Sequence, residues 1–284
     1  MANYLDPKND LTFKRVFGEH KHLCKSLLNS MLPLEKPVID IEYQTGELIP
    51  ELAKILRNTL VDVRCIDAGG RQFIVEMQLY WSDSFKSRVV LNASKACLKQ
   101  LDKAEEFRLL QPVYALNFIN DTFENSPEME NEYLHHYKIV NIKHTEKQIE
   151  DLEFFFVELP KFKPQNRAEK KLHDLWMLFL TCVNEKTDEI PQELMENELT
   201  REALTYMERG AYTKGQLEAY DKFKDAIMTE RSIIGDAMKK GREEKNVETV
   251  INSNNAGLPV ETVSIITGLT IDEIKRIIEN YQTK

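Results

Sequence analysis

The sequence predicts a mixed α/β core followed by an all-α C-terminal region. Two short runs rich in β-branched and aromatic residues, 60–66 and 72–80, flank a glycine-containing turn and indicate a β-hairpin. Residues 113–119 form a continuous apolar run, which is typical of a strand buried on both faces. The later part of the chain is helical in pattern almost to its end. We therefore expect a domain of residues 1–164 and a helical region of residues 165–284.

The first expected element is a helix that Asn9 or Asp10 can cap. Apolar residues at helical spacing continue this helix to about Leu32, and Pro33 ends it. Residues 38–49 then contain the alternation of apolar side chains that a strand shows.

The hairpin that follows has a register that its turn sets. A loop of residues 68–70 with Gly70 in the left-handed conformation makes Asp67 pair with Arg71. In that register Asp62 lies opposite Glu76 on one face of the hairpin, with Cβ atoms about 5 Å apart. Gln78, two residues beyond Glu76, shares that face because side chains alternate along a strand.

Two opposed carboxylates repel each other, and a bound divalent cation would reverse the sign of that interaction. Mg²⁺ takes oxygen ligands and is usually held by one or two carboxylates with waters and phosphate oxygens. Asp62 and Glu76 can supply the carboxylates, and the main-chain carbonyl of Met77 is a further candidate ligand. The alternative interpretation is a solvated sheet face on which these acids pair with Arg64 and other cations.

A helix over residues 84–107 is expected next, and one of its sides carries basic residues. Its apolar stripe is predicted from five residues at helical spacing: Val90, Ala93, Cys97, Leu101 and Ala104. The basic residues on the opposite side are Arg88, Lys95, Lys99 and Lys103. They fit either phosphate contacts beside a metal site or a solvated helix face, and Arg88 is the best candidate for a DNA contact.

The remaining pattern adds two strands and several helices. The strands are expected at 133–142 and 152–159, and the longer helical stretches at 168–183, 199–208 and 214–240. His135 and His136 are adjacent on a strand and point to opposite faces, so we interpret them as structural or surface residues. A short helix between Pro259 and Gly268 and a capping box at Thr270–Glu273 predict a final helix pair, which we interpret as a packing or oligomerisation element.

Composition excludes several classes of protein. No run of 18 apolar residues occurs and the first residues lack the apolar core of a signal peptide, so we expect no membrane span and a cytoplasmic location. Four widely spaced cysteines indicate reduced thiols and argue against a zinc site. The net charge is −9, but residues 1–120 carry 16 basic and 15 acidic residues, so a local phosphate-binding surface is compatible with it.

The ordered motifs of this chain resemble those of the PD-(D/E)XK nuclease superfamily, and most of all the Rpn branch of recombination-promoting nucleases and putative transposases. The resemblance rests on Asp62 with Glu76-x-Gln78, Asn9-Asp10-Leu-Thr-Phe-Lys14, Arg88, Gln100, Gln111-Pro-Val-Tyr114, Phe156-Val-Glu-Leu-Pro-Lys161 and Thr267-Gly-Leu-Thr-Ile-Asp-Glu-Ile274. It covers most of the chain and implies a restriction-endonuclease-like core, in which helices flank a mixed sheet.

The resemblance implies a metal-dependent DNA endonuclease linked to recombination or mobile elements, which uses Mg²⁺ or Mn²⁺. Asp62 and Glu76 would bind the metal, and Asp10 of the first helix is a further candidate ligand. Gln78 stands where the superfamily often has lysine, so the protein is either a weaker nuclease or one that uses another cation. Lys14 would be a structural or phosphate-facing residue.

The alternative is a catalytically weak or inactive nuclease fold that binds DNA or protein. For either function we expect DNA as a partner, no membrane, and a homo-oligomer formed through the helical C-terminal region.

Overall fold

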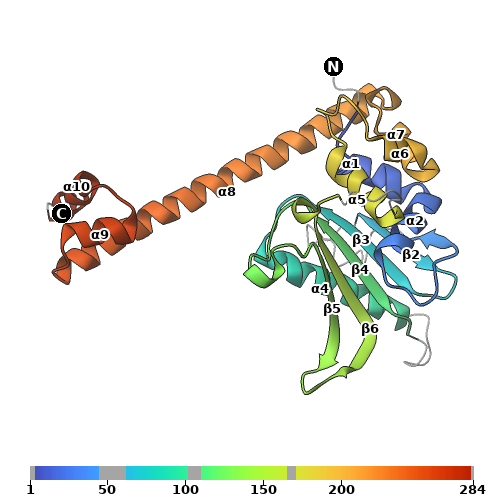
Figure 1. The fold of residues 1–284 in the computed structure, drawn as a ribbon, viewed down its shortest axis with the longest axis horizontal. Helices are drawn as coiled ribbons and strands as arrows, with labels where there is room; N and C mark the ends of the chain where they lie inside the picture. Colours follow the sequence, from blue (N-terminus) through green and yellow to red (C-terminus); the bar gives the residue numbers. More distant parts are fainter. Residues whose placement is uncertain (1–3, 45–61, 102–109, 165–170, 283–284) are drawn as a thin grey trace. The chain divides into compact units, whose positions relative to one another are not determined.

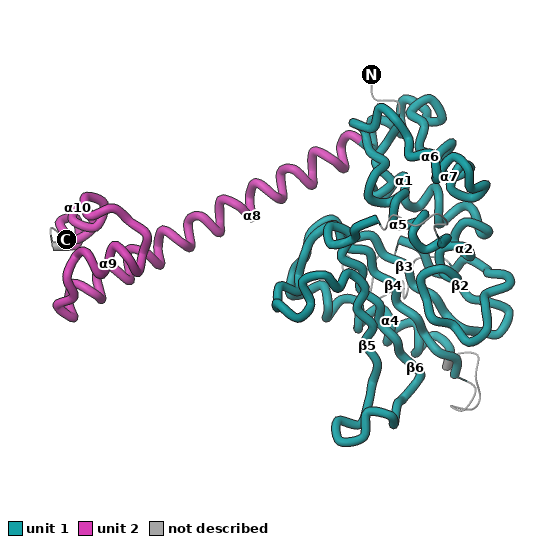
Figure 2. The backbone as a smooth tube through the Cα atoms, in the orientation of Figure 1, with its two compact units in different colours: residues 1–220 teal, residues 221–284 magenta. Residues whose placement is uncertain are grey.

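The computed structural model describes residues 4–44, 62–101, 110–164 and 171–282. The chain forms two compact units, residues 1–220 and residues 221–284, which Figure 2 shows in different colours. The first unit contains the sheet and the helices that cover it, whereas the described part of the second unit is helical.

A six-stranded mixed sheet is the centre of the first unit, with strand order β1-β2-β3-β4-β6-β5 (Figure 1). Its strands are β1 (Ile41–Tyr43), β2 (Val63–Asp67), β3 (Gln72–Gln78), β4 (Val113–Ile119), β5 (Leu134–Asn141) and β6 (His144–Glu158). β3, β4 and β6 are parallel to one another, and the other pairings are antiparallel. The ends of β3, β4 and β6 and the starts of β2 and β5 therefore meet at one end of the sheet.

The hairpin of β2 and β3 has the predicted register. Cα partners are Val63 with Val75 and Cys65 with Phe73, as predicted, and the ladder begins one residue after Asp62. Gly70 has a φ of +85°, and the Asp67 N–H donates to the Arg71 carbonyl at 3.1 Å. A left-handed glycine therefore closes the three-residue loop as the sequence indicates.

Helix α4 (Asp83–Leu101) connects the parallel strands β3 and β4 and packs on one face of the sheet. Its buried apolar residues are Phe85, Val89, Ala93 and Ala96. The predicted stripe is confirmed at Ala93, which is buried, and at Cys97, which packs against the same core, but it is wrong at Val90, which is 48% exposed. Lys95, expected on the opposite side, is only 7% exposed. Asn92 and Lys95 also lie on the buried side, and the predicted stripe omits Phe85 and Val89, which mark that side. The predicted residues 102–107 lie outside the described ones.

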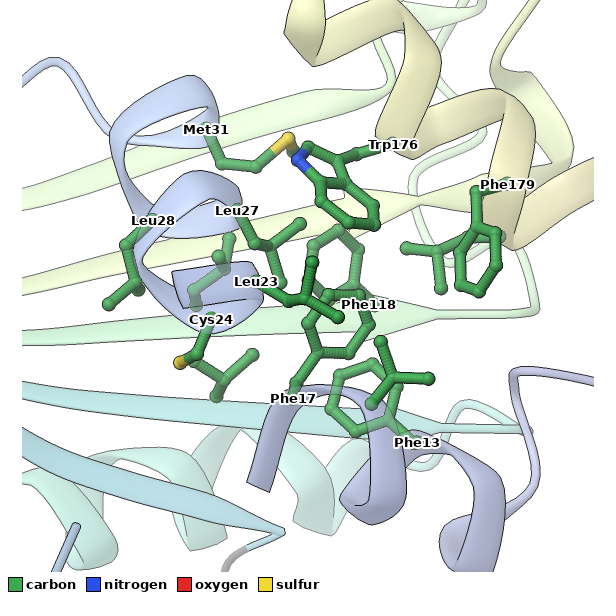
Figure 3. Packing of buried hydrophobic residues seen from close by; sticks show 14 of the residues in the cluster. Phe13, Phe17, Leu23, Cys24, Leu27, Leu28, Met31, Phe118, Trp176 and Phe179 are labelled. Atoms are coloured by element: carbon green, nitrogen blue, oxygen red, sulfur yellow. The ribbon is translucent and has the colours of Figure 1, made fainter. Parts of the chain in front are cut away.

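The other face of the sheet is covered by helices from both ends of the first unit. They are α1 (Asp10–Phe13), a π-helix η1 (Lys14–Gly18), α2 (Lys21–Met31), α5 (Leu172–Cys182), α6 (Gln192–Glu196) and α7 (Glu198–Met207). Figure 3 shows how Phe17 of η1, Phe118 of β4 and Trp176 of α5 meet in the core. The Phe17 and Trp176 rings lie 5.4 Å apart, and the buried indole N–H of Trp176 donates to Ser26 Oγ at 3.0 Å.

The first predicted helix is therefore three shorter elements. Asn9 is its cap, because the Asn9 side chain accepts the Leu11 N–H at 3.0 Å. The helical run is broken between Gly18 and Lys21, and the second part ends at Met31, before Pro33. The π-helical turn at Lys14–Gly18 places Val16 and Phe17 in the core.

The sequence pattern assigns α5, α6 and α7 to the helical region of residues 165–284. In the structure, these helices pack in the core of the first unit. The boundary between 164 and 165 stays a prediction about sequence organisation. In space, the division into compact units falls between residues 220 and 221.

The second unit contains most of α8 (Lys214–Asn255), together with α9 (Val260–Thr267) and α10 (Ile271–Gln282). Val250, Val263 and Ile274 form its small core. Gly268 ends α9 with a φ of +69°, and Thr270 and Glu273 exchange the predicted capping-box hydrogen bonds. In the described part of the chain, no helix is long and apolar enough to cross a membrane.

Candidate active site

The candidate residues gather where β3 ends and β2 begins. Asp62 directly precedes β2, and Glu76 and Gln78 are among the last three residues of β3. The Met77 N–H donates to Asp62 Oδ2 at 2.7 Å, so Asp62 is held across the hairpin by the residue between Glu76 and Gln78. The N–H and C=O of one residue in an antiparallel ladder point to the same neighbouring strand. The Met77 carbonyl therefore faces the side of β3 on which Asp62 lies.

A second carboxylate and a cation adjoin Asp62. Lys14 Nζ lies 2.5 Å from Asp10 Oδ1 and 3.6 Å from Asp62 Oδ1, so one ammonium is shared by two acids. Because Asn9 caps the first helix, the Asp10 carboxylate is available for this contact. Burial and the neighbouring Asp10 together raise the pKa of Asp62 to about 7, although the Met77 N–H and Lys14 act to lower it.

Glu76 is buried on the face of the sheet that α4 covers, with 6% of its surface exposed. Asn92 Nδ2 of α4 donates to Glu76 Oε1 at 2.9 Å. Burial raises the pKa of Glu76, while this hydrogen bond and the positive charge of Arg88 oppose the rise. Asp62 and Glu76 are therefore two acids whose charged forms are poorly stabilised by their surroundings.

Gln78 is fixed at both ends of its amide. Its Nε2 donates to the Tyr80 carbonyl at 2.9 Å, and Arg88 donates to its Oε1 at 2.6 Å. The Arg88 guanidinium also lies over the Phe85 ring, 4.8 Å from its centroid. A permanent positive charge is thus held beside the position at which the superfamily often has lysine.

The sequence did not identify two amides near Glu76. Asn92 and Asn117 are both buried, and the Oδ1 atom of each has no hydrogen-bond partner among the described residues. Asn117 is the Cα partner of Glu76 in the parallel pair of β3 and β4. An asparagine inside the apolar run 113–119 was the available signal, since a buried polar side chain in a strand needs a partner.

The predicted phosphate contacts divide into two groups. Arg88 donates to Gln78 and Lys14 pairs with Asp62, so both basic residues contact candidate site residues. Lys95 lies on the same buried side of α4 as Asn92, but no polar contact joins it to Asp62, Glu76 or Gln78 in the described part of the chain. The expectation of one solvated basic side on this helix is therefore wrong for Lys95.

The donor atoms suit a hard cation, because carboxylate, carbonyl and amide oxygens are the ligands that Mg²⁺ prefers. Two partner-less amide oxygens and two carboxylates with raised pKa values lie on or beside the end of β3. Among the described residues, no three Asp, Glu, His or Cys side chains converge closely enough to hold a metal ion. The oxygen set therefore fits one or two carboxylate ligands supplemented by neutral oxygens.

The predicted histidines have structural partners. His135 is buried and contacts Glu158 at 2.6 Å, whereas His136 contacts Glu153 at 2.6 Å and stacks on Phe155. Cys24, Cys65, Cys97 and Cys182 are all free thiols.

Comparison with known proteins identifies the family. Neither the curated proteins nor the solved structures contain a significant match to the chain. The family model of the PD-(D/E)XK nuclease family transposase matches residues 7–237, a span that includes the whole sheet and every candidate site residue. The fold, the order of the motifs and this match together show that the chain belongs to the PD-(D/E)XK nuclease family transposases.

Proposed function

We propose that this protein is a metal-dependent DNA endonuclease that hydrolyses phosphodiester bonds, with a role in DNA recombination or the movement of mobile elements. The observation that carries the proposal is the pair Asp62 and Glu76 at one end of the hairpin. Both are largely buried, both have raised pKa values, and the N–H of Met77, the residue after Glu76, donates to Asp62. Buried acids with raised pKa values are functional-site candidates, and these two lie at the same end of the hairpin.

Asp62, Glu76 and the Met77 carbonyl would hold the metal, with Asp10 as a further ligand. We propose Mg²⁺ as the natural ion, with Mn²⁺ able to substitute. When bound, such an ion lowers the pKa of a coordinated water and neutralises charge on the phosphodiester. Lys14 lies between Asp10 and Asp62, so this ammonium would have to move toward a DNA phosphate when a cation binds.

Gln78 and Arg88 would act together in the proposed reaction. A water oxygen forms a bond to phosphorus, the P–O ester bond breaks, and the leaving oxygen takes up a proton. The Gln78 amide is held by Tyr80 and Arg88, and in this proposal it would orient the water. Arg88 would supply the positive charge that the neutral glutamine lacks, and such a charge stabilises the developing oxyanion.

The test is DNA cleavage by the purified protein in Mg²⁺ or Mn²⁺. We expect cleavage by the wild type and by Asp40→Ala, which removes an exposed aspartate outside the site. Asp62→Ala is expected to cleave at least about 100-fold more slowly, because a charged group of the catalytic set is removed. Equal cleavage by Asp62→Ala and the wild type, with both proteins folded by circular dichroism, would contradict the proposal.

A second candidate function is a nuclease fold that binds DNA or a protein without catalysis. The observation in its favour is that both polar ends of Gln78 are already engaged, by Tyr80 and Arg88. If Gln78→Lys creates cleavage that the wild type lacks, this second function is favoured. Saturable Mg²⁺ binding in a calorimeter that is lost in Glu76→Ala counts against it.

We also propose that the helical C-terminal region mediates self-association. Apolar side chains on α8 are strongly exposed, with 63% of Ile233 and 72% of Met238 accessible to solvent. Such residues are typical of a surface that a partner covers. Light scattering after gel filtration should give a dimer or larger assembly for the wild type and a smaller species for Ile233→Asp with Met238→Asp. A monomeric wild type at the same concentration would contradict self-association.

A further inference from the structure

Three aromatic rings surround one lysine next to the candidate active site. Lys86 Nζ of α4 lies 5.3 Å from the ring centroid of Trp81, 5.0 Å from that of Phe123 and 5.8 Å from that of Tyr137. The Trp81 and Phe123 rings are stacked, 4.2 Å apart with 20° between their planes. We call these four side chains the aromatic cluster. Nothing in the proposed cleavage reaction uses them.

The aromatic cluster is continuous with the site. Trp81 comes three residues after Gln78, and the intervening Tyr80 carbonyl accepts the Gln78 amide. The Trp81 ring lies 5.9 Å from the Phe85 ring, over which the Arg88 guanidinium is placed. A row of rings therefore leads from Arg88 to Trp81 and Phe123.

Hydrogen bonds from the loop after β4 hold these rings in place. The Phe123 N–H donates to Glu158 Oε1 at 2.7 Å, and the Trp81 N–H donates to Asp121 Oδ2 at 3.0 Å. Glu158 is itself fully buried and paired with Lys161 at 2.7 Å. The backbone at Trp81 and Phe123 is thus fixed by buried or charged acceptors, which makes a rigid platform rather than two loose surface rings.

The platform is partly open to solvent. Trp81 and Phe123 are only half-buried, Lys86 is exposed, and 40% of Tyr137 is accessible. The exposed cation–π contact of Lys86 is a weak interaction compared with the stacking of a nucleobase on an aromatic ring. A base can therefore displace the ammonium, which remains close enough to contact the adjoining phosphate.

We infer, on the basis of the proposed nuclease function, that the aromatic cluster binds an unpaired base of the DNA substrate and that this enzyme acts on single-stranded or locally unpaired DNA. In a duplex, each base is covered on both faces by its neighbours and cannot stack on a protein ring. An unpaired base exposes its face, and aromatic side chains beside basic ones are the usual means of binding it. Lys86 and Arg88 of α4, which lie over the rings of Trp81 and Phe85, are the basic residues that would contact the adjoining phosphates.

Binding in EDTA tests this inference without cleavage. Fluorescence anisotropy compares a labelled 20-nucleotide oligothymidylate with a 20-base-pair duplex, for the wild type and Tyr137→Ala. We expect the wild type to prefer the single strand and Tyr137→Ala to lose about 5- to 100-fold in affinity for it, with little change for the duplex. Tyr137→Phe, which keeps the ring, should bind as the wild type does. Tyr281→Ala is the matched control, because it removes a tyrosine that is 56% exposed on α10.

Tryptophan emission gives a second readout. The chain has two tryptophans, and Trp176 is fully buried, so quenching by the single strand reports on Trp81. Lys86→Gln should reduce the slope of log affinity against log salt by about 0.7, as expected for one lost contact to a single-strand phosphate. Unchanged single-strand affinity in Tyr137→Ala, or equal losses for single strand and duplex, would overturn the inference. Preferential cleavage of duplex DNA would also overturn it while leaving the nuclease proposal intact, whereas failure of Asp62→Ala to reduce cleavage affects only the nuclease proposal.

Discussion

Replacing Asp62 with asparagine should stabilise the metal-free protein at alkaline pH. Only 14% of the Asp62 side chain is exposed, and burial with the adjoining Asp10 raises its pKa to about 7 from an ordinary value of 3.8. The folded state therefore binds the Asp62 proton more tightly than the unfolded state does. The stabilisation by this proton is fully present below about pH 4 and is lost as the pH rises through 7.

The shift of about three pKa units corresponds to a penalty of about 4 kcal/mol on the folded state at pH 8, at about 1.4 kcal/mol for each unit. Asparagine removes this penalty and keeps an oxygen that can accept the Met77 N–H. The opposing attraction of Lys14 is already included in this shift, so it is not subtracted again. The expected net gain at pH 8 is thus about 2–4 kcal/mol, declining toward zero near pH 4.

Urea denaturation in EDTA at pH 8, 6 and 4 measures this difference. Asp67→Asn is the control, because Asp67 Oδ2 pairs with Arg71 at 2.7 Å and its replacement should destabilise the protein at pH 8. Adding Mg²⁺ should stabilise the wild type more than Asp62→Asn. The reasoning is refuted if Asp62→Asn is less stable than the wild type at pH 8, as Asp67→Asn is expected to be.

Variants at three further positions test other parts of the structure. Glu158→Gln removes a fully buried carboxylate whose pKa is lowered overall, since the favourable effect of Lys161 and the backbone donors exceeds that of burial. The variant should lose about 3 kcal/mol in urea denaturation at pH 7, and the loss should shrink as the pH falls below 4.5 and through the lowered pKa of Glu158. Gly70→Ala should lose about 1–2 kcal/mol in the same assay, because Gly70 has a φ of +85° and an added Cβ would lie 3.0 Å from Gln111 Cγ. Arg88→Gln should slow cleavage by about 100-fold or more while Arg88→Lys retains part of the activity, and equal rates for both would contradict a charge requirement.

The hairpin was predictable from sequence because its information is local. A left-handed glycine closing a three-residue loop sets the register, and the register alone places Asp62 opposite Glu76. The buried strand β4 was predictable for a similar reason, since its apolar residues are consecutive. Turn residues and apolar runs were therefore sufficient to predict the hairpin and β4, which together position the candidate site.

The polar surroundings of Glu76 were not predictable in this way. Asn92 is buried and its amide donates to Glu76, a contact between a strand and the helix that follows it, which apolar periodicity does not record. The stripe of α4 was misassigned at Val90, although Phe85, Val89 and Ala93 stand at helical spacing on the buried side. Asn117 is buried among apolar neighbours for the same reason, since its amide donates to the Ala115 and Phe155 carbonyls.

The aromatic cluster was equally hidden from sequence. Its residues come from the loop after β3, the start of α4, the loop after β4 and the strand β5, and only the sheet order brings them together. Each of them alone is an ordinary aromatic or basic residue. The distances to one ammonium are what give the cluster a chemical meaning.

The most direct test of the metal site is a crystal structure of the protein grown or soaked with Mn²⁺. We expect an anomalous peak for a Mn²⁺ ion bound by the carboxylates of Asp62 and Glu76, with Lys14 displaced from its position between Asp10 and Asp62. The proposed metal site is contradicted if Asp62 and Glu76 are well ordered in the crystal but no anomalous peak lies between them, at a Mn²⁺ concentration that supports cleavage.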